Sequence, residues 1–252
     1  MIKILLSGAN GRMGQAITRL VADSAQAEIV CGVDLNTESK GGFPVYADFA
    51  AVQEQPDVVV DFSNPANFQN LMDYVLQHKI PVVVATTGLN KEQKEQLCAA
   101  SATVPVFFSA NMSLGVNLIC ELAKKAARFL GDSFDIEIVE RHHNQKLDAP
   151  SGTALAIADA INEELDNTAH YVYDRHSVRK KREKNEIGIH AVRGGTIVGD
   201  HTVIFAGDHE VIELRHSAAS REIFASGAVK AAVFMAGQPA GLYDMKNLIN
   251  GK

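Results

Sequence analysis

Short β-branched apolar runs alternate with stretches of helical periodicity in the N-terminal half, and this alternation constrains the fold more than any other feature. Strands are expected at Ile2–Ser7, Glu28–Val33, Val58–Phe62, Val82–Ala85 and Val106–Phe108, and helices at Met13–Ala22, Ala66–His78 and Lys91–Ala102. Strands that alternate with helices pair in parallel through right-handed crossovers. Several of these runs are apolar on both faces, as in sheets that helices cover on both sides. The pattern therefore predicts a doubly wound parallel sheet.

The pattern changes in the second half of the chain. A long helix is expected at Val116–Leu130, where Gly131 can adopt the left-handed conformation of a C-cap. The elements expected after it are a strand, a helix, three closely spaced strands and a last helix: Asp135–His142, Ser151–Asp166, Gly188–Arg193, Thr202–Ala206, Val211–His216 and Ala219–Ala236. Consecutive strands with short glycine-containing connections favour antiparallel pairing. We therefore predict an α/β protein with two domains. Residues 1–113 and 224–252 form the first domain, and residues 114–223, inserted between them, form a second, α+β domain built on a mostly antiparallel or mixed sheet.

Composition and charge exclude several classes of protein. The 252 residues carry a net charge of -6, which argues against a general nucleic-acid binder. Cys31, Cys98 and Cys120 form no Cys-x-x-Cys pair, as expected in a reducing compartment without a disulfide framework or zinc site. No apolar run approaches the ~18 residues of a membrane span. We expect a cytoplasmic protein without nucleic-acid or membrane partners, and a solvated loop or helix start at the basic run Arg179–Arg182 with Lys184.

A glycine-rich turn follows the first expected strand. Gly8-Ala9-Asn10-Gly11-Arg12-Met13-Gly14 has the spacing G-x-x-G-x-x-G and opens a helix, whose N-terminal N–H groups favour a bound phosphate. Asp34 ends the second strand, 20 residues after Gly14, where dinucleotide sites carry an acidic residue for the ribose. These features predict a Rossmann-type dinucleotide site rather than a ligand-free βα connection. Leu35 stands where an NADP-selective site would often carry Arg, which favours NADH, although Lys40 could still reach a 2′-phosphate.

Two further polar segments follow expected parallel strands. They are Ala85-Thr86-Thr87-Gly88 and Ser109-Ala110-Asn111-Met112. Open α/β sheets bind their ligands at the carboxyl ends of their strands, which makes both segments candidates for cofactor contact. Thr, Ser and Asn are also favoured in caps and turns, so each segment alone leaves that alternative open.

The segment Glu140–Thr153 concentrates the residues that could carry out acid catalysis. His142, His143 and Lys146 offer a general acid near neutral pH and a fixed positive charge. Pro150 and Ser151 favour a helix start, so Ser151-Gly152-Thr153 would present N–H groups and a hydroxyl to a substrate carboxylate. The alternative is a polar surface turn. No histidine spacing is typical of a metal site, and no metal is expected.

Together these motifs resemble the dihydrodipicolinate (4-hydroxy-tetrahydrodipicolinate) reductase family of lysine and diaminopimelate synthesis. The likeness rests on GANGRMG, ATTG, SANM and ERHHNQKLDAPSGTAL, and it continues through RGGTIVGDHTVIFAG and SREIFASGAVKAA over essentially the whole chain. It implies reduction of a small cyclic dicarboxylate by NADH or NADPH and a homotetramer built through the sheet of the second domain. Ala85 stands where many members have Gly, and Leu35 where some have Arg.

The resemblance also implies roles for single residues. His142 matches the proton donor and Lys146 a second catalytic cation, while His143, Gly152 and Thr153 match substrate-binding positions. The residues matching cofactor contacts are Gly8, Ala9, Asn10, Gly11, Arg12, Met13, Asp34, Ala85, Thr86, Thr87, Ser109, Ala110, Asn111 and Met112. Arg221 is a further residue that could lie near the substrate.

Two other functions compete with this prediction. Another nicotinamide-dependent dehydrogenase, of the sugar-oxidoreductase kind, would typically carry Glu-Lys-Pro after a parallel strand, where this chain has Ala85-Thr86-Thr87. A non-catalytic NAD-sensing protein would need no acid, so His142 and Lys146 argue against it.

In the reductase, hydride would reach an electron-poor carbon of a conjugated imine, and His142 would supply the proton. The two domains would close about the segments near Leu114 and Arg221.

Overall fold

The computed structural model describes residues 1–251, and its internal contacts divide them into two compact units. The first unit comprises Met1–Leu114 and the segment from Glu222 onward, and the second comprises Gly115–Arg221. Among the described residues, no helix has the length and apolar character needed to cross a bilayer.

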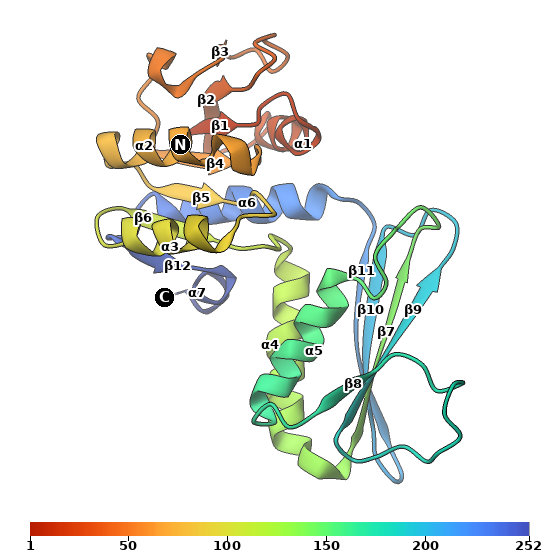
Figure 1. Ribbon diagram of the computed structural model, residues 1–252. Coiled ribbons are helices and arrows are strands. Elements are labelled where there is room, and N and C mark those ends of the chain that lie inside the picture. The colour runs from red at the N-terminus through yellow and green to blue at the C-terminus, as the bar shows by residue number, and fades with distance from the viewer. Residues whose placement is uncertain (252) are drawn as a thin grey trace. The chain divides into compact units, whose positions relative to one another are not determined.

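The first unit is built on a seven-stranded sheet in the order β12-β6-β5-β4-β1-β2-β3, with every neighbouring pair parallel (Figure 1). Its strands are β1 (Ile2–Ser7), β2 (Ala27–Val33), β3 (Val45–Tyr46), β4 (Val58–Asp61), β5 (Val82–Val84), β6 (Pro105–Phe108) and β12 (Gly241–Tyr243). The strand order reverses direction between β1 and β4. In open α/β sheets the carboxyl edge at such a reversal is where ligands bind.

Helices cover both faces of this sheet (Figure 1). One face packs against α1 (Arg12–Val21), α6 (Glu222–Met235) and α7 (Met245–Asn250), and the other against α2 (Phe68–His78) and α3 (Lys91–Ala100). Successive residues of each strand point to opposite faces of the sheet: Ile4 and Leu6 pack in the core on the side of α1, α6 and α7 (the first core), and Leu5 in the core on the side of α2 and α3 (the second core). The predicted doubly wound parallel sheet is confirmed.

Helix α6 lies unusually close to its neighbours because small residues face the first core. Ala225, Ala228, Ala231 and Ala232 are all buried on it. A Cβ added at Gly227 would overlap the backbone carbonyl oxygen of Met112, in the loop after β6. The glycine therefore sets the distance between α6 and the segment Ser109–Met112.

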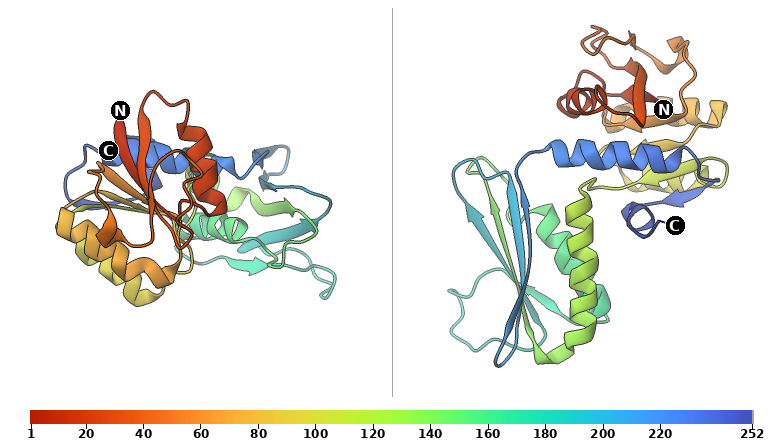
Figure 2. Two further views of the ribbon diagram at one scale, coloured as in Figure 1. Left: turned by 90° about the horizontal axis from the view of Figure 1, so that it is seen from above. Right: turned by 180° about the vertical axis from the view of Figure 1, so that it is seen from behind.

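The second unit is built on a five-stranded sheet in the order β11-β10-β7-β9-β8. Its strands are β7 (Asp135–His142), β8 (His170–Val172), β9 (Glu186–Arg193), β10 (Gly199–Ala206) and β11 (Val211–Ala218). Helices α4 (Leu114–Leu130) and α5 (Gly152–Glu164) cover one face, burying Ile138, Val203 and Phe205 among others (Figure 2). Gly131 ends α4 in the left-handed region with φ +53°, as expected for a C-cap.

This second sheet is mixed, and antiparallel pairing does not predominate in it. β10 pairs antiparallel with β7 and β11, whereas β7–β9 and β8–β9 are parallel. The expectation that consecutive strands would be neighbours is wrong for β9 and β10, because β7 lies between them. Their connection must cross the end of β7, and it hydrogen-bonds there: Gly194 N donates to the carbonyl of His142, and Asn144 N to that of Gly195.

We expect Gly227→Ala to destabilise the first unit, because an added methyl group must displace either α6 or the Met112 carbonyl. Overpacking of this kind costs roughly 1–3 kcal/mol, which lowers the melting temperature by several degrees in a protein of this size. Thermal unfolding followed by circular dichroism measures the change. Gly237→Ala is the matched control, because a Cβ there meets open space. Equal melting temperatures for the two variants would contradict the packing described above.

Candidate active site

The glycine-rich turn between β1 and α1 has the geometry that phosphate binding requires. Gly8 has φ +79°, and a Cβ on it would lie 2.6 Å from the Phe62 carbonyl oxygen. A Cβ on Gly14 would overlap the carbonyl oxygens of Gly8 and Ala9. Gly11 is the N-cap of α1, and within residues 1–251 no side chain caps the first N–H groups of this helix. The turn thus fits an anionic ligand held by backbone N–H groups at a helix N-terminus.

Asp34 lies beside this turn, as expected. Its Oδ2 accepts from the backbone N–H of Asn10 at 2.9 Å, and its Oδ1 from that of Asn36 at 3.0 Å. The Asn10 side chain donates to the carbonyls of Asn36 and Glu38 and so holds the following loop in place. In that loop Leu35 is 99% exposed, and Lys40 lies 3.3 Å from Glu38.

The other predicted cofactor segments lie at the carboxyl ends of neighbouring strands of the same sheet. Thr86 Oγ1 donates to Asp61 Oδ2 at 2.6 Å, so this hydroxyl supports the loop, while Thr87 is exposed. Ser109 Oγ donates to the carbonyl of Asn111, and Met112 is buried against α6. Of the other predicted cofactor residues, Ala85 is buried after β5 and Ala110 is exposed after β6. In the glycine-rich turn and the start of α1, Ala9 is buried, Asn10 and Met13 are half-buried, and Gly11 and Arg12 are exposed.

In the second unit, His142 is the last residue of β7, and its side chain is buried on the helix-covered face. Its Nδ1 lies 2.7 Å from Oε2 of Glu140, two residues earlier on the same face. A Cβ added at Gly199 of β10 would lie 3.0 Å from its Nε2. The imidazole is therefore held through Nδ1, and the glycine leaves room beside Nε2.

Glu140 is fully buried at the centre of a polar cluster. Arg193 donates from Nη1 to Oε2 at 2.7 Å and from Nη2 to Oε1 at 2.8 Å, and Ser151 N donates to Oε1 at 2.9 Å. Burial alone would raise the pKa of this carboxyl, but the hydrogen bonds from Arg193, His142 and Ser151 outweigh it and hold the pKa below its ordinary value. Glu140 is thus an ionised acceptor.

Helix α5 begins where the sequence predicts, with Ser151 as its N-cap. Within the expected anion-binding segment Ser151-Gly152-Thr153, the polar groups of Ser151 already have partners in the protein. Its N–H donates to Glu140, its Oγ accepts from Ala154 N at 3.1 Å, and the same oxygen lies 3.0 Å from His201 Nε2. Gly152, which is exposed, and Thr153 form the first turn, where the helix dipole favours an anion.

Lys146 lies in the loop between His142 and α5, with its Nζ 2.9 Å from Asp148 Oδ1. The hydrogen bond from Lys146 lowers the pKa of Asp148 against a smaller opposing effect of burial. Arg193 Nη2 donates to the backbone carbonyl of Asp148 at 2.7 Å. The loop that carries Lys146 is therefore tied to the Glu140 cluster.

His143, the neighbour of His142, faces a different environment. It lines an open cavity of about 340 Å³ together with residues of the β9–β10 connection and with Arg221; the complete lining is His143, Asn144, Gln145, Gly195, Thr196, Val198 and Arg221. The structure thus places His143 and Arg221 at the same cavity. The sequence alone did not show whether Arg221 lies near the predicted substrate residues.

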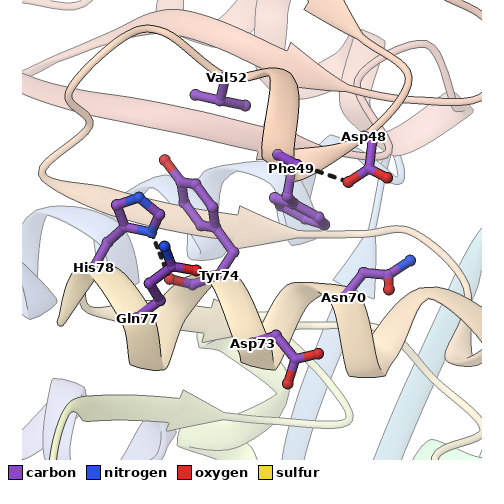
Figure 3. Close-up of a pocket in the computed structure, with 9 residues that line it drawn as sticks. Asp48, Phe49, Val52, Asn70, Asp73, Tyr74, Gln77 and His78 are labelled. Carbon is purple, nitrogen blue, oxygen red and sulfur yellow. Dashed lines mark hydrogen bonds between the residues drawn. The ribbon is translucent and has the colours of Figure 1, made fainter.

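Other features of the chain lie apart from these residues. A cavity of about 290 Å³ lies between η1 (Phe49–Ala51) and α2, where Figure 3 shows Phe49 facing Tyr74, and it contains none of the predicted site residues. His170, Glu183 and Glu186 are close enough to share a cation. However, the Lys180 ammonium already lies 2.7 Å from Glu183 and 3.4 Å from Glu186.

The basic run lies in the irregular loop before β9, and most of it is exposed, but Arg182 differs from the expectation. Its side chain is largely buried and bonds to Asp135, Glu137 and the carbonyls of Ile136 and Glu186. This arginine holds the loop against β7.

Sequence reasoning missed four residues that shape the site: Asp61, Glu140, Arg193 and His201. Two of them carried a signal in the sequence. A charged residue at the end of an apolar run marks Asp61, and the alternation that begins with Ile136 and Ile138 places Glu140 on their face of the strand. Arg193 and His201 carried no local signal, because β9 and β10 reach β7 only through the sheet's non-sequential order.

Comparisons with known proteins bear on both units. Residues 2–112 match the family model described as "Dihydrodipicolinate reductase, N-terminus", and residues 115–249 match "Dihydrodipicolinate reductase, C-terminus". The chain belongs to the dihydrodipicolinate reductase family. Membership of this family implies an NAD(P)H-dependent oxidoreductase, and the glycine turn described above fits a nicotinamide dinucleotide.

Individual members of the dihydrodipicolinate reductase family match over nearly the full length. Proteins named 4-hydroxy-tetrahydrodipicolinate reductase from Caldanaerobacter subterraneus subsp. tengcongensis and Clostridium tetani are 53% and 49% identical, each over 99% of this chain and 98% of their own. The structure of a dipicolinate-bound dihydrodipicolinate reductase from Paenisporosarcina sp. TG-14 covers 97% of each chain with a TM-score of 0.82 and 28% identity.

His201 gives the second unit a pH-dependent stability that can be measured. Burial, with the nearby His142 adding to it, lowers the pKa of His201 to about 4. In the unfolded chain this histidine has a pKa of about 6.5. Between about pH 6.5 and pH 4 the unfolded chain therefore binds a proton that the folded protein does not, and the free energy of unfolding falls as the pH is lowered. We expect the wild-type free energy of unfolding to fall by roughly 1–3 kcal/mol more than that of His201→Gln between about pH 7 and pH 4.

Denaturant unfolding at several pH values measures this difference. His176→Gln, at an exposed histidine, is the control and should keep the wild-type pH dependence. If the free energy of unfolding changes with pH in the same way in wild type and His201→Gln, His201 is not held neutral in the folded protein.

Proposed function

We propose that this chain catalyses the NAD(P)H-dependent reduction of 4-hydroxy-tetrahydrodipicolinate to tetrahydrodipicolinate, a step of lysine and diaminopimelate biosynthesis. The observation that carries the proposal is the combination of a full-length family match with His142, which Glu140 links to the N-cap of α5, and with Lys146 in the loop between them. A nicotinamide site alone would fit many dehydrogenases, whereas this second cluster is suited to an anionic substrate that needs a proton.

The first unit would hold the cofactor. Backbone N–H groups of Gly8–Met13 would bind the pyrophosphate, and Asp34 would accept from the adenosine ribose. The loops Ala85–Thr87 and Ser109–Met112 would contact the nicotinamide end. When bound, the reduced nicotinamide supplies the hydride.

Asp34 followed by the uncharged Leu35 favours NADH, while Lys40 leaves the use of NADPH open. Assays with both coenzymes measure which of the two the protein prefers.

The second unit would bind the substrate and supply the proton. The first turn of α5, at Gly152 and Thr153, would receive one carboxylate, with His143 beside the substrate and the Lys146 ammonium compensating its negative charge. Hydride addition to the conjugated imine pushes an electron pair into the ring, which then needs a proton. His142, protonated on both ring nitrogens, would donate that proton from Nε2 and become neutral, with its Nδ1–H still bonded to Glu140.

The second sheet also suggests how copies of the chain would assemble. Within residues 1–251, helices cover one of its faces and not the other, and the uncovered face presents apolar side chains, among them Val192 and Val211, between charged ones. We expect this face to pair with other copies in a homotetramer, and we expect the enzyme to work in the cytoplasm, as suits a biosynthetic reaction on small metabolites.

The direct test follows the loss of reduced-nicotinamide absorbance with freshly generated substrate. We expect the wild type to turn over, and His142→Gln and Lys146→Gln each to lower kcat by roughly 10²–10⁴-fold, the usual contribution of a positioned proton donor. Both variants should retain NADH affinity, because neither residue belongs to the first unit. Lys181→Gln, at an exposed lysine, is the control for a change of charge. Wild-type inactivity, or normal turnover in both variants, would end the assignment.

A further inference from the structure

Glu140 touches two separate parts of the candidate site. It is fully buried, and each of its oxygens has a different set of partners. Oε2 faces His142, and Oε1 faces the backbone N–H of Ser151, the N-cap of α5. Arg193 spans both oxygens with a bidentate pair, which compensates the charge and fixes the plane of the carboxylate.

The Oε2 contact determines which nitrogen of His142 carries a proton. An ionised carboxylate only accepts hydrogen bonds, and this carboxylate is held ionised by Arg193. His142 Nδ1 must therefore be the donor. The transferable proton then belongs to Nε2, which lies beside Gly199.

The Oε1 contact fixes the start of α5. Ser151 N donates to it, and Arg193 also holds the carbonyl of Asp148 in the preceding loop. Because Gly152 and Thr153 follow Ser151 directly, the position of their N–H groups depends on the same carboxylate.

We propose that Glu140 is a positioning residue that couples the proton donor to the carboxylate-binding turn: one oxygen sets the tautomer and orientation of His142, and the other sets the N-terminus of α5. The coupling rests on the function proposed above, but the tautomer can be read without any substrate. An alternative is that Glu140 only balances the charge of Arg193. In that case its removal would lower stability without changing His142 or anion binding specifically.

The chain contains a matched control on the same strand. Glu137 also accepts from two arginines, Arg175 and Arg182, and from a histidine, His190, whose Nε2 lies 2.7 Å away. It lies three positions before Glu140, so its side chain leaves β7 on the opposite face. Glu137→Gln therefore removes a comparable ion-pair network away from His142.

The first measurement is histidine-ring ¹⁵N–¹H correlation NMR on the full-length protein without ligand. We expect the neutral form of wild-type His142 to be the Nδ1–H tautomer, with a bare Nε2. Glu140→Gln should move this signal toward the other tautomer, whereas Glu137→Gln should alter His190 and leave His142 unchanged. A wild-type Nε2–H tautomer would overturn the proposal even if no variant folds.

The second measurement separates the two halves of the coupling. Pyridine-2,6-dicarboxylate (dipicolinate) serves as the anion probe, by calorimetry, beside steady-state kinetics. Glu140→Gln should lower kcat by roughly 10²-fold or more, as loss of the correct tautomer does in other enzymes, and should weaken probe binding roughly tenfold. His142→Gln should lower kcat but keep probe affinity, and Glu140→Asp should recover part of both losses.

Unchanged probe affinity in folded Glu140→Gln would overturn the coupling, as would equal effects of Glu140→Gln and Glu137→Gln on kcat. If instead the wild type does not turn over the substrate, the proposed function fails, while the tautomer and the dipicolinate affinity still report on Glu140 independently.

Discussion

The buried pair of Glu140 and Arg193 is the interaction on which the second unit's chemistry depends. A carboxylate without solvent is costly unless it is paired and fully hydrogen-bonded, and here four donors surround its two oxygens. Arg193 can reach it because β9 pairs directly with β7, with Arg193 opposite His142 in the register, so the non-sequential strand order allows the pair to form. The orientation of His142 therefore depends on this buried ion pair, through the bond from His142 Nδ1 to Glu140.

The two units use the same physical device for different anions. Each places the N-terminus of a helix at the carboxyl end of a strand, α1 after β1 and α5 after β7, so that backbone N–H groups and the helix dipole meet negative charge. They differ in how the turn is made. In the first unit glycines bring the backbone close to the ligand, since side chains at Gly8 and Gly14 would collide with carbonyl groups. In the second, buried polar side chains fix the turn.

The sequence predicted those parts whose signals are local. β1, the glycine turn and α1 follow from neighbouring residues, and the start of α5 follows from Pro150 and Ser151. The short strands β3, β8 and β12 and the helix α7 were missed, because two or three paired residues carry no periodicity. Strand order was only partly predictable, since nothing near β9 indicates that β7 will lie between it and β10. The partners of His142 were hidden for the same reason: Arg193 lies 53 residues from Glu140 along the chain.

A crystal structure with NADH and dipicolinate both bound would locate the substrate relative to His142, Lys146 and the start of α5. We expect a dipicolinate carboxylate within hydrogen-bonding distance of Gly152 and Thr153 N–H, with the Lys146 ammonium beside it and His142 Nε2 facing the ring. A dipicolinate bound away from the start of α5, with His142 and Lys146 both remote from its ring, would show that these residues do not form the substrate site.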